Sequence, residues 1–156
     1  MVRSQAVVCT QGVRRMAELR IEFEQFPNEQ VRQFVINGLD NFNIATTGEA
    51  AFYPVNFFLR DTRGEVLGGL LGQIWGKWLH ITYLWVSEVA RKGGHGRGLM
   101  ARAEQYAIER GCVGVHVSTF SFQARPLYEK LGYEVFGVLE GIPPGHSHFY
   151  LKKRLA

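Results

Sequence analysis

Glycines and cations gather in one stretch of the chain, between Val86 and Met100. An apolar run over residues 81–86 leads into this stretch, and a helical pattern leads out of it. Glycines allow successive backbone N–H groups to turn towards one ligand, and the start of a helix adds a partial positive charge. Within the stretch no carboxylate follows Glu88. The sequence therefore predicts a phosphate or pyrophosphate site built by Arg91, Lys92, Gly93, Gly94, His95, Gly96, Arg97 and Gly98.

Two common phosphate-binding loops do not fit this order of residues. A nucleotide triphosphatase loop ends in Gly-Lys followed by Ser or Thr, whose hydroxyl holds magnesium, and that ending is absent here. A dinucleotide-binding loop needs a third glycine at the position of Leu99. The spacing that remains is Arg91-x-x-Gly94-x-Gly96. Taken alone, it is also compatible with a glycine-rich turn in a basic surface loop.

Two motifs in the right order and at the right separation indicate that the loop binds a ligand. Arg91-x-x-Gly94-x-Gly96 matches the Gln/Arg-x-x-Gly-x-Gly/Ala motif that holds the pyrophosphate of acetyl-coenzyme A in the GNAT N-acetyltransferases. Downstream, Ser-Phe-Gln-Ala-Arg-Pro-Leu-Tyr-Glu-Lys-Leu-Gly-Tyr, residues 121–133, resembles the second signature of that family. The resemblance extends from Asn43 to the C-terminus. Residues 119–124 and 143–146 also resemble a bacterial subgroup of uncharacterised GNAT proteins.

The pattern of apolar residues predicts an alternation of strands and helices. The expected helices cover residues 28–42, 96–110 and 124–131, with a loop over 43–51, and the expected strands cover residues 18–24, 56–59, 66–75, 78–86, 113–119, 133–139 and 146–153. This order is similar to that of the GNAT fold. The resemblance implies an α/β (α+β) domain with a mixed, mostly antiparallel central sheet flanked by helices. The sheet is expected to splay apart at the cofactor site, between the strand ending at Val86 and the strand beginning at Val113.

Length and charge point to one ordinary globular domain. The chain has 156 residues and a formal net charge of +4. Residues 1–16 hold three arginines and no acid, and we expect them to form an extension of the domain at 17–156, or a segment upstream of a start at Met16. An acid-free, arginine-containing leader also faintly resembles an organellar transit peptide.

The composition disfavours several classes of partner. Residues 17–156 carry 15 basic and 14 acidic residues, so we expect no specific binding of nucleic acid. No apolar stretch approaches the length of a membrane span. Cys9 and Cys112 have no metal-ligand or redox spacing, so we expect two free thiols, no metal site and a cytoplasmic protein.

Acetyl transfer to an amine needs the amine to lose a proton. An amine of pKa ~10.4 costs roughly 4–5 kcal/mol to deprotonate at pH 7, so a general base is useful. His80 is the candidate base, since it lies on the strand that leads to the loop and shares one strand face with Thr82, Leu84 and Val86. In related GNAT enzymes the catalytic Glu or His often holds the matching strand position. A packed histidine is the alternative, and Glu88 is a second candidate base.

The resemblance implies further roles. Tyr128 matches the family tyrosine whose hydroxyl protonates the leaving thiolate. Trp85 and Val86 are expected to offer backbone groups to the pantetheine arm and the acetyl carbonyl. Ser121 stands where the family has an Asn that contacts the pantetheine. The loop Pro143-Pro144-Gly145 is expected to border the acceptor site.

The sequence thus predicts an acetyl-CoA-dependent N-acetyltransferase that acts by direct attack of a primary amine. The sequence shows no cysteine near a His-Asp pair that could act as the nucleophile of a covalent intermediate. The expected acceptor is a small metabolite, with protein or peptide N-acetylation as the alternative enzyme and a non-catalytic acyl-CoA-binding module as the alternative class. Dimerisation through the last strands is common in the family, so a homodimer is compatible with the resemblance.

Overall fold

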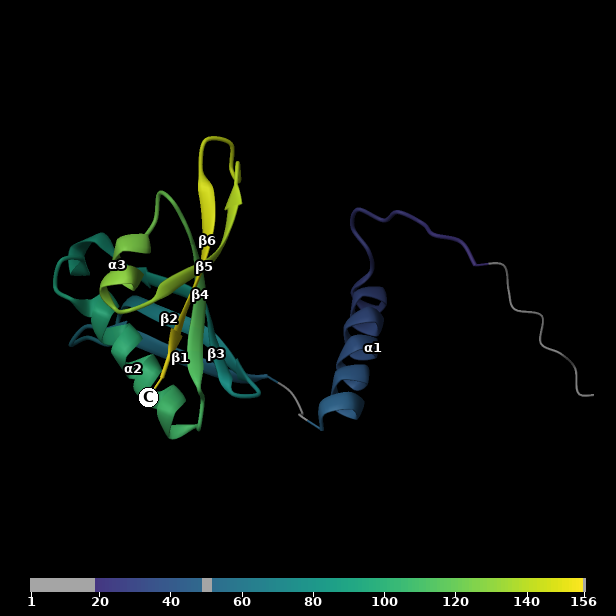
Figure 1. Ribbon diagram of the computed structural model, residues 1–156, viewed down its shortest axis with the longest axis horizontal. Helices are drawn as coiled ribbons and strands as arrows, with labels where there is room; N and C mark the ends of the chain where they lie inside the picture. The colour runs from purple at the N-terminus through teal and green to yellow at the C-terminus, as the bar shows by residue number, and fades with distance from the viewer. Residues whose placement is uncertain (1–18, 49–51, 156) are drawn as a thin grey trace, which may run out of the picture. The chain divides into compact units, whose positions relative to one another are not determined.

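A computed structural model describes residues 19–48 and 52–155 (Figure 1). Its contacts divide the chain into two units, Met1–Gly38 and Leu39–Ala156, and each unit is described by itself. The boundary falls inside the first helix. Residues 1–16, the expected extension, lie outside the described residues, as does Cys9. No described helix is long and apolar enough to cross a membrane.

The first helix, α1, covers Glu29–Thr47. Asn28 caps it as expected, because the Gln30 N–H donates to Asn28 Oδ1 at 2.7 Å. The helix continues to Thr47, so the loop expected over residues 43–51 is wrong for residues 43–47, and residues 49–51 of it lie outside the described residues. The Thr46 hydroxyl donates to the Phe42 carbonyl at 2.8 Å, and Gly48 ends the helix at a φ of +69°.

The strand expected over residues 18–24 is also wrong for the part that the structure describes. Residues 19–24 form no strand, and the alternating Leu19, Ile21 and Phe23 are exposed. Alternation shows only that one side of an extended segment is apolar. A strand also needs a neighbouring edge with free backbone groups, which the sequence pattern does not reveal.

Six strands form one sheet in the order β1-β2-β3-β4-β6-β5. Their bounds are Tyr53–Arg60 (β1), Val66–Trp75 (β2), Trp78–Val86 (β3), Gly114–Phe120 (β4), Glu134–Glu140 (β5) and Ser147–Arg154 (β6). Only β3 and β4 pair in parallel, and the other four pairings are antiparallel. This confirms the expected mixed, mostly antiparallel α/β sheet flanked by helices. The hairpin turn between β2 and β3 has Gly76 at a φ of +56°.

Two helices cover one face of this sheet. They are α2 (His95–Glu109) and α3 (Arg125–Lys130), and a short 3₁₀ helix, η1 (Glu88–Ala90), precedes α2. Figure 1 shows α2 and α3 together beside the sheet. Pro126 occupies the first turn of α3, where the missing N–H costs little. The buried face of α2 carries Leu99, Met100, Ala103 and Ala107.

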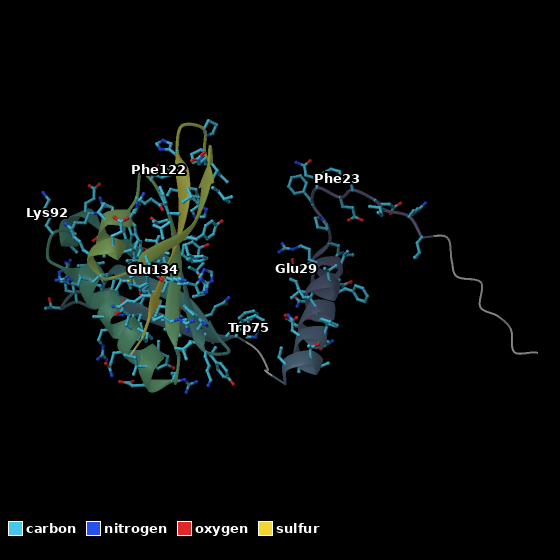
Figure 2. All side chains as sticks on the ribbon, in the orientation of Figure 1. Phe23, Glu29, Trp75, Lys92, Phe122 and Glu134 are labelled. Atoms are coloured by element: carbon cyan, nitrogen blue, oxygen red, sulfur yellow. The ribbon has the colours of Figure 1, made fainter. Side chains whose placement is uncertain are left out.

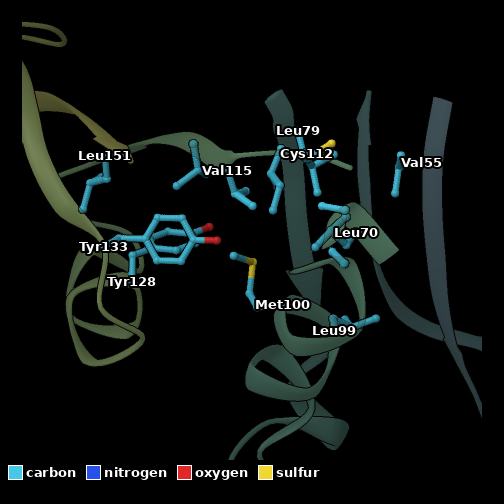
Figure 3. Close-up of a cluster of buried hydrophobic side chains, with 14 of the residues drawn as sticks. Val55, Leu70, Leu79, Leu99, Met100, Cys112, Val115, Tyr128, Tyr133 and Leu151 are labelled. Carbon is cyan, nitrogen blue, oxygen red and sulfur yellow. The ribbon is translucent and has the colours of Figure 1, made fainter. Parts of the chain in front are cut away.

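The core lies between these helices and the sheet (Figure 3). Leu70, Leu79 and Val115 of the sheet meet Met100 of α2, and all four are inaccessible to solvent. Cys112 is a buried free thiol. Because the close packing of such a core tolerates little movement, it fixes the start of α2 relative to the ends of β3 and β4.

Glu104 anchors α2 to the C-terminal strands. Its carboxylate accepts a hydrogen bond from the Tyr133 hydroxyl at 3.0 Å and an ion pair from Lys153 Nζ at 2.6 Å. All three side chains are largely removed from water, so this network is worth more than a surface ion pair. Burial and the Glu104 charge together raise the pKa of Tyr133 well above its ordinary value.

Candidate active site

The glycine-rich loop opens α2 as expected. Gly94 is the residue before the first turn and has a φ of +76°, a conformation that favours glycine. The first turn of α2 holds no acidic residue, so its free N–H groups and its positive dipole end face solvent without a competing carboxylate. Arg91 holds the loop to β3, because its Nε donates to the Val86 carbonyl at 3.1 Å. Lys92 has a φ of +66°.

The sheet splays where the sequence predicted. Pairing between β3 and β4 runs from Trp78–Gly114 to Ile81–Val117 and then stops. A cleft of about 710 Å³ opens beyond this point. It is lined by residues 82–86, 90–92, 94–97, 117–119, 122–124 and 127–128. The cleft therefore joins the splayed strands, the start of α2 and the helix α3.

Most of the predicted site residues come together in this cleft. The lining includes Trp85, Val86, Arg91, Lys92, Gly94, His95, Gly96, Arg97 and Tyr128. Gly93 and Gly98 do not line it. They border a second hollow of about 360 Å³ on the β1 side of the loop, together with Phe57, Phe58 and Arg102.

A bulge in β3 changes which side chains share a face. Leu71 pairs with Tyr83 and the next residue, Gly72, pairs with Ile81, so Thr82 has no partner on β2. One extra residue reverses the alternation. Leu84 packs on the core together with Ile81. The expected common face of His80, Thr82, Leu84 and Val86 is therefore wrong.

His80 instead lies on the face away from α2 and does not line the cleft. Its ring stacks on that of His116, with 4.4 Å between centroids and 2° between planes. Partial burial lowers the pKa of His80 below its ordinary value. Burial, together with the neighbouring His80, lowers the pKa of His116 as well. His80 thus remains a predicted base, held as a neutral imidazole beside the splay.

Ser121 is engaged with the loop before β6. Its Oγ lies 3.1 Å from His146 Nδ1 and accepts the N–H of Ser147 at 3.3 Å. The side chain does not line the cleft. The predicted contact between Ser121 and a pantetheine arm therefore has no counterpart in this lining.

Tyr128 lines the cleft from α3. Only 4% of the residue is exposed, and its ring packs edge-on against Tyr133 at 5.9 Å (Figure 3). Burial raises the pKa of Tyr128 to about 12. The phenol is therefore a hydroxyl donor over the whole physiological pH range.

Gln123 and Thr119 are lining residues that the sequence interpretation missed. Gln123 Oε1 accepts hydrogen bonds from the Phe120 N–H at 2.9 Å and from the Thr119 hydroxyl at 3.2 Å. These bonds fix the turn between β4 and α3. The only signal for Gln123 was its place inside the second motif, between Ser121 and Tyr128.

The cleft joins a strand splay to a glycine-rich helix start and a buried tyrosine. Residues 14–133 match the family described as Acetyltransferase (GNAT) family. The chain belongs to this family. It is therefore an acetyltransferase.

Relatives and solved structures agree with the assignment. A blasticidin-S acetyltransferase of Streptomyces morookaense is 44% identical over 94 residues, which are 60% of this chain and 69% of that protein. A crystal structure of an acetyltransferase from Bacillus cereus is 31% identical, with a TM-score of 0.77 over 86% of this chain and 98% of the other. An aminoglycoside 6'-N-acetyltransferase complexed with coenzyme A shares the fold at 18% identity, with a TM-score of 0.58 over 65% of this chain and 72% of that one.

Proposed function

We propose that this acetyltransferase moves the acetyl group of acetyl-CoA to a primary amine of a small molecule, by direct attack of the amine. The observation that carries the proposal is the single cleft that joins the start of α2, the β3–β4 splay and Tyr128. Each part of it suits a different part of the reactants.

The start of α2 suits the pyrophosphate. Free N–H groups of a helix start are directed at one point and attract anions, and Lys92 and Arg97 add full positive charges beside them. Figure 2 shows Lys92 projecting from the outer edge of the loop. A carboxylate here would oppose a pyrophosphate, and the cleft lining contains no Asp or Glu.

The splay suits the pantetheine arm. Beyond Ile81 and Val117 the facing edges of β3 and β4 no longer pair with each other. Backbone N–H and C=O groups at such edges need partners, and the amide groups of a pantetheine arm can supply them. Trp85 and Val86 are the residues that we expect to make these bonds.

Tyr128 suits the leaving thiolate. A buried phenol that keeps its proton can donate a hydrogen bond to sulfur as negative charge develops there. The same burial disfavours a free thiolate of coenzyme A. It therefore raises the pKa of the leaving thiol as well as that of the phenol. Tyr128 is therefore proposed to stabilise the departing sulfur and to supply its proton.

One relative favours a small-molecule acceptor, and the charge of the cleft lining disfavours a polycationic one. The relative of 44% identity is a blasticidin-S acetyltransferase, which favours a small amine over a protein N-terminus. The cleft lining has no acidic residue that would hold a polycation such as a polyamine. Because His80 does not line the cleft, it is proposed to take the proton of the amine through water.

Thiol release from acetyl-CoA, measured with a panel of small primary amines and of short peptides, tests the proposal. We expect turnover with some small amines and none with the peptides. Turnover with peptides alone would move the function to protein N-acetylation. Absence of turnover with every amine would contradict the proposal.

A further inference from the structure

A row of aromatic rings crosses the sheet next to the cleft. We call it the aromatic ladder; in order of contact it consists of Phe122, Phe120, His148, Tyr150 and Phe136. Phe122 and Phe120 stack with 5.3 Å between centroids and 3° between planes, and Phe120 and His148 stack at 4.3 Å and 19°. Tyr150 lies 4.8 Å from His148 and 6.3 Å from Phe136. The ladder thus links the end of β4 to β6 and β5.

The ladder lies on the sheet face away from α2 and α3. Val117 pairs with Leu151, and both are buried in the core. Side chains alternate between the two faces along a strand. The pair Phe120–His148, three residue pairs further along, therefore lies on the other face. Within residues 52–155, α2 and α3 pack on the core side only, and this leaves the ladder face uncovered by them.

The ladder is continuous with the cleft. Phe122 lines the cleft and is the end ring of the ladder, with 56% of the residue exposed. On the other side of the splay, Tyr83 and Trp85 also line the cleft and are 65% and 58% exposed. The Thr82 bulge places both of them on the ladder face. Aromatic rings therefore flank the point where an acetyl group held in the splay meets an acceptor.

The charges nearby do not suit a polycation. The ladder contains no carboxylate. Glu134, at its far end, is 3.5 Å from Lys152 Nζ, and that ammonium also lies 5.8 Å from the Phe136 ring centroid. What the ladder offers near the cleft is the exposed Phe122 ring, supported from behind by a parallel Phe120. Such a surface recognises a flat ring by offset stacking.

We propose that the natural acceptor carries a planar, uncharged aromatic or heteroaromatic ring that stacks on Phe122, and that this stacking directs its amine into the cleft. The inference rests on the proposed function and names the substrate class of the same site. Tyr83 and Trp85 close the opposite side of the acceptor site. Phe136, at the distant end of the ladder, takes no part in the binding.

The test compares 2-phenylethylamine with 2-cyclohexylethylamine. Both carry the same tether and amine, but the cyclohexyl ring is puckered and slightly more apolar. Burial of apolar area alone would favour the cyclohexyl compound, whereas stacking favours the phenyl compound. We expect kcat/KM to be about fivefold higher for 2-phenylethylamine. An equal or reversed preference would overturn the inference.

Two variants locate the preference. In Phe122→Leu the ratio of the two kcat/KM values is expected to fall to about one, because an apolar side chain remains but the flat ring is gone. Phe136→Leu is the matched control, since this ring is equally exposed, at 55%, and belongs to the same ladder but does not line the cleft. Retention of the preference in Phe122→Leu would overturn the inference.

Binding of the N-acetyl derivatives of the two amines separates this inference from the proposed function. They lack a free amine, so their affinities, measured by NMR titration in the presence of coenzyme A, do not depend on turnover. Tighter binding of the phenyl amide without turnover of any amine would contradict the proposed function and support the ring site. Turnover of amines without any difference between the two amides would support the function and overturn the ring site.

Discussion

The imidazole rings of His80 and His116 lie parallel, 4.4 Å between centroids, where β3 and β4 are about to separate. The pair belongs to a row of four register partners, Gln73, His80, His116 and Lys152, across β2, β3, β4 and β6. Two cationic imidazoles stacked in this way would repel each other, and partial burial of both rings disfavours their charged forms further. The fold therefore lowers the pKa of both histidines and favours their neutral forms.

The neutral pair predicts sensitivity to acid. A histidine whose pKa is lowered by folding binds fewer protons in the native than in the unfolded state, so stability is present above the ordinary pKa and is lost as pH falls through the lowered one. We expect the decrease in Tm between about pH 7.5 and about pH 5.5 to be smaller in His116→Gln than in the wild type, by about 2 °C. His95→Gln, an exposed histidine, is the control. An unchanged decrease in His116→Gln would contradict the neutral pair.

If His80 receives the proton of the amine, its removal changes the pH profile as well as the rate. We expect His80→Gln to lower kcat/KM by about 10²-fold or more and to remove the ascending limb of the pH profile. Initial rates of thiol release, measured across pH with the acceptor amine varied from well below KM to saturation, give kcat/KM and kcat separately. A uniform small loss with an unchanged pH profile would assign His80 a packing role.

Two neighbouring tyrosines predict opposite phenotypes. Tyr128→Phe removes a hydroxyl that lines the cleft, so we expect kcat to fall by about 10²-fold while the affinity for acetyl-CoA is retained. Tyr133→Phe removes the hydrogen bond to Glu104, so we expect a loss of about 1–2 kcal/mol in the free energy of unfolding and near-normal kcat. Thermal denaturation and steady-state kinetics of both variants distinguish the roles. A stability loss in Tyr128→Phe equal to that of Tyr133→Phe, without a kinetic defect, would contradict the assignment.

Ser121 tests the departure from the family pattern. Because its hydroxyl bonds His146 and the Ser147 N–H, Ser121→Ala is expected to cost up to about 1 kcal/mol of stability and to leave the Kd for acetyl-CoA within about twofold. Calorimetric titration gives the Kd. A tenfold loss of affinity for acetyl-CoA would instead indicate that Ser121 contacts the pantetheine arm.

The sheet and its loop were predictable because local signals and topology agreed. The strands 66–75 and 78–86 were predicted with the bounds that the structure has, since two short apolar runs flank an obvious Gly76-Lys77 turn. The helix expected over residues 96–110 begins one residue earlier, at His95, after the left-handed Gly94 of the predicted glycine-rich loop.

The bulge at Thr82 was not predictable, and it decides which side chains meet the substrate. A bulge inserts one residue without a distinct sequence signal, and every later side chain on β3 then changes face. The common face expected for His80, Thr82, Leu84 and Val86 was therefore wrong. The stacking of Phe120 on His148 depends on pairing between segments 28 residues apart, which periodicity along one strand does not report.

The central claim is that acetyl-CoA binds with its pyrophosphate at the start of α2 on the cleft side, and calorimetric titration of two aspartate variants tests it most directly. A Cβ at Gly96 would make only an ordinary contact with Leu127, at 3.6 Å, and one at Gly98 would meet nothing within 4 Å, so both variants should fold. Gly96 lines the cleft, whereas Gly98 faces the second hollow. We predict saturable binding of acetyl-CoA by the wild type, a loss of at least about 10²-fold in Gly96→Asp from charge repulsion, and a much smaller loss in Gly98→Asp. Unchanged binding by Gly96→Asp, or an equal loss in both variants, would contradict the assignment of the cleft.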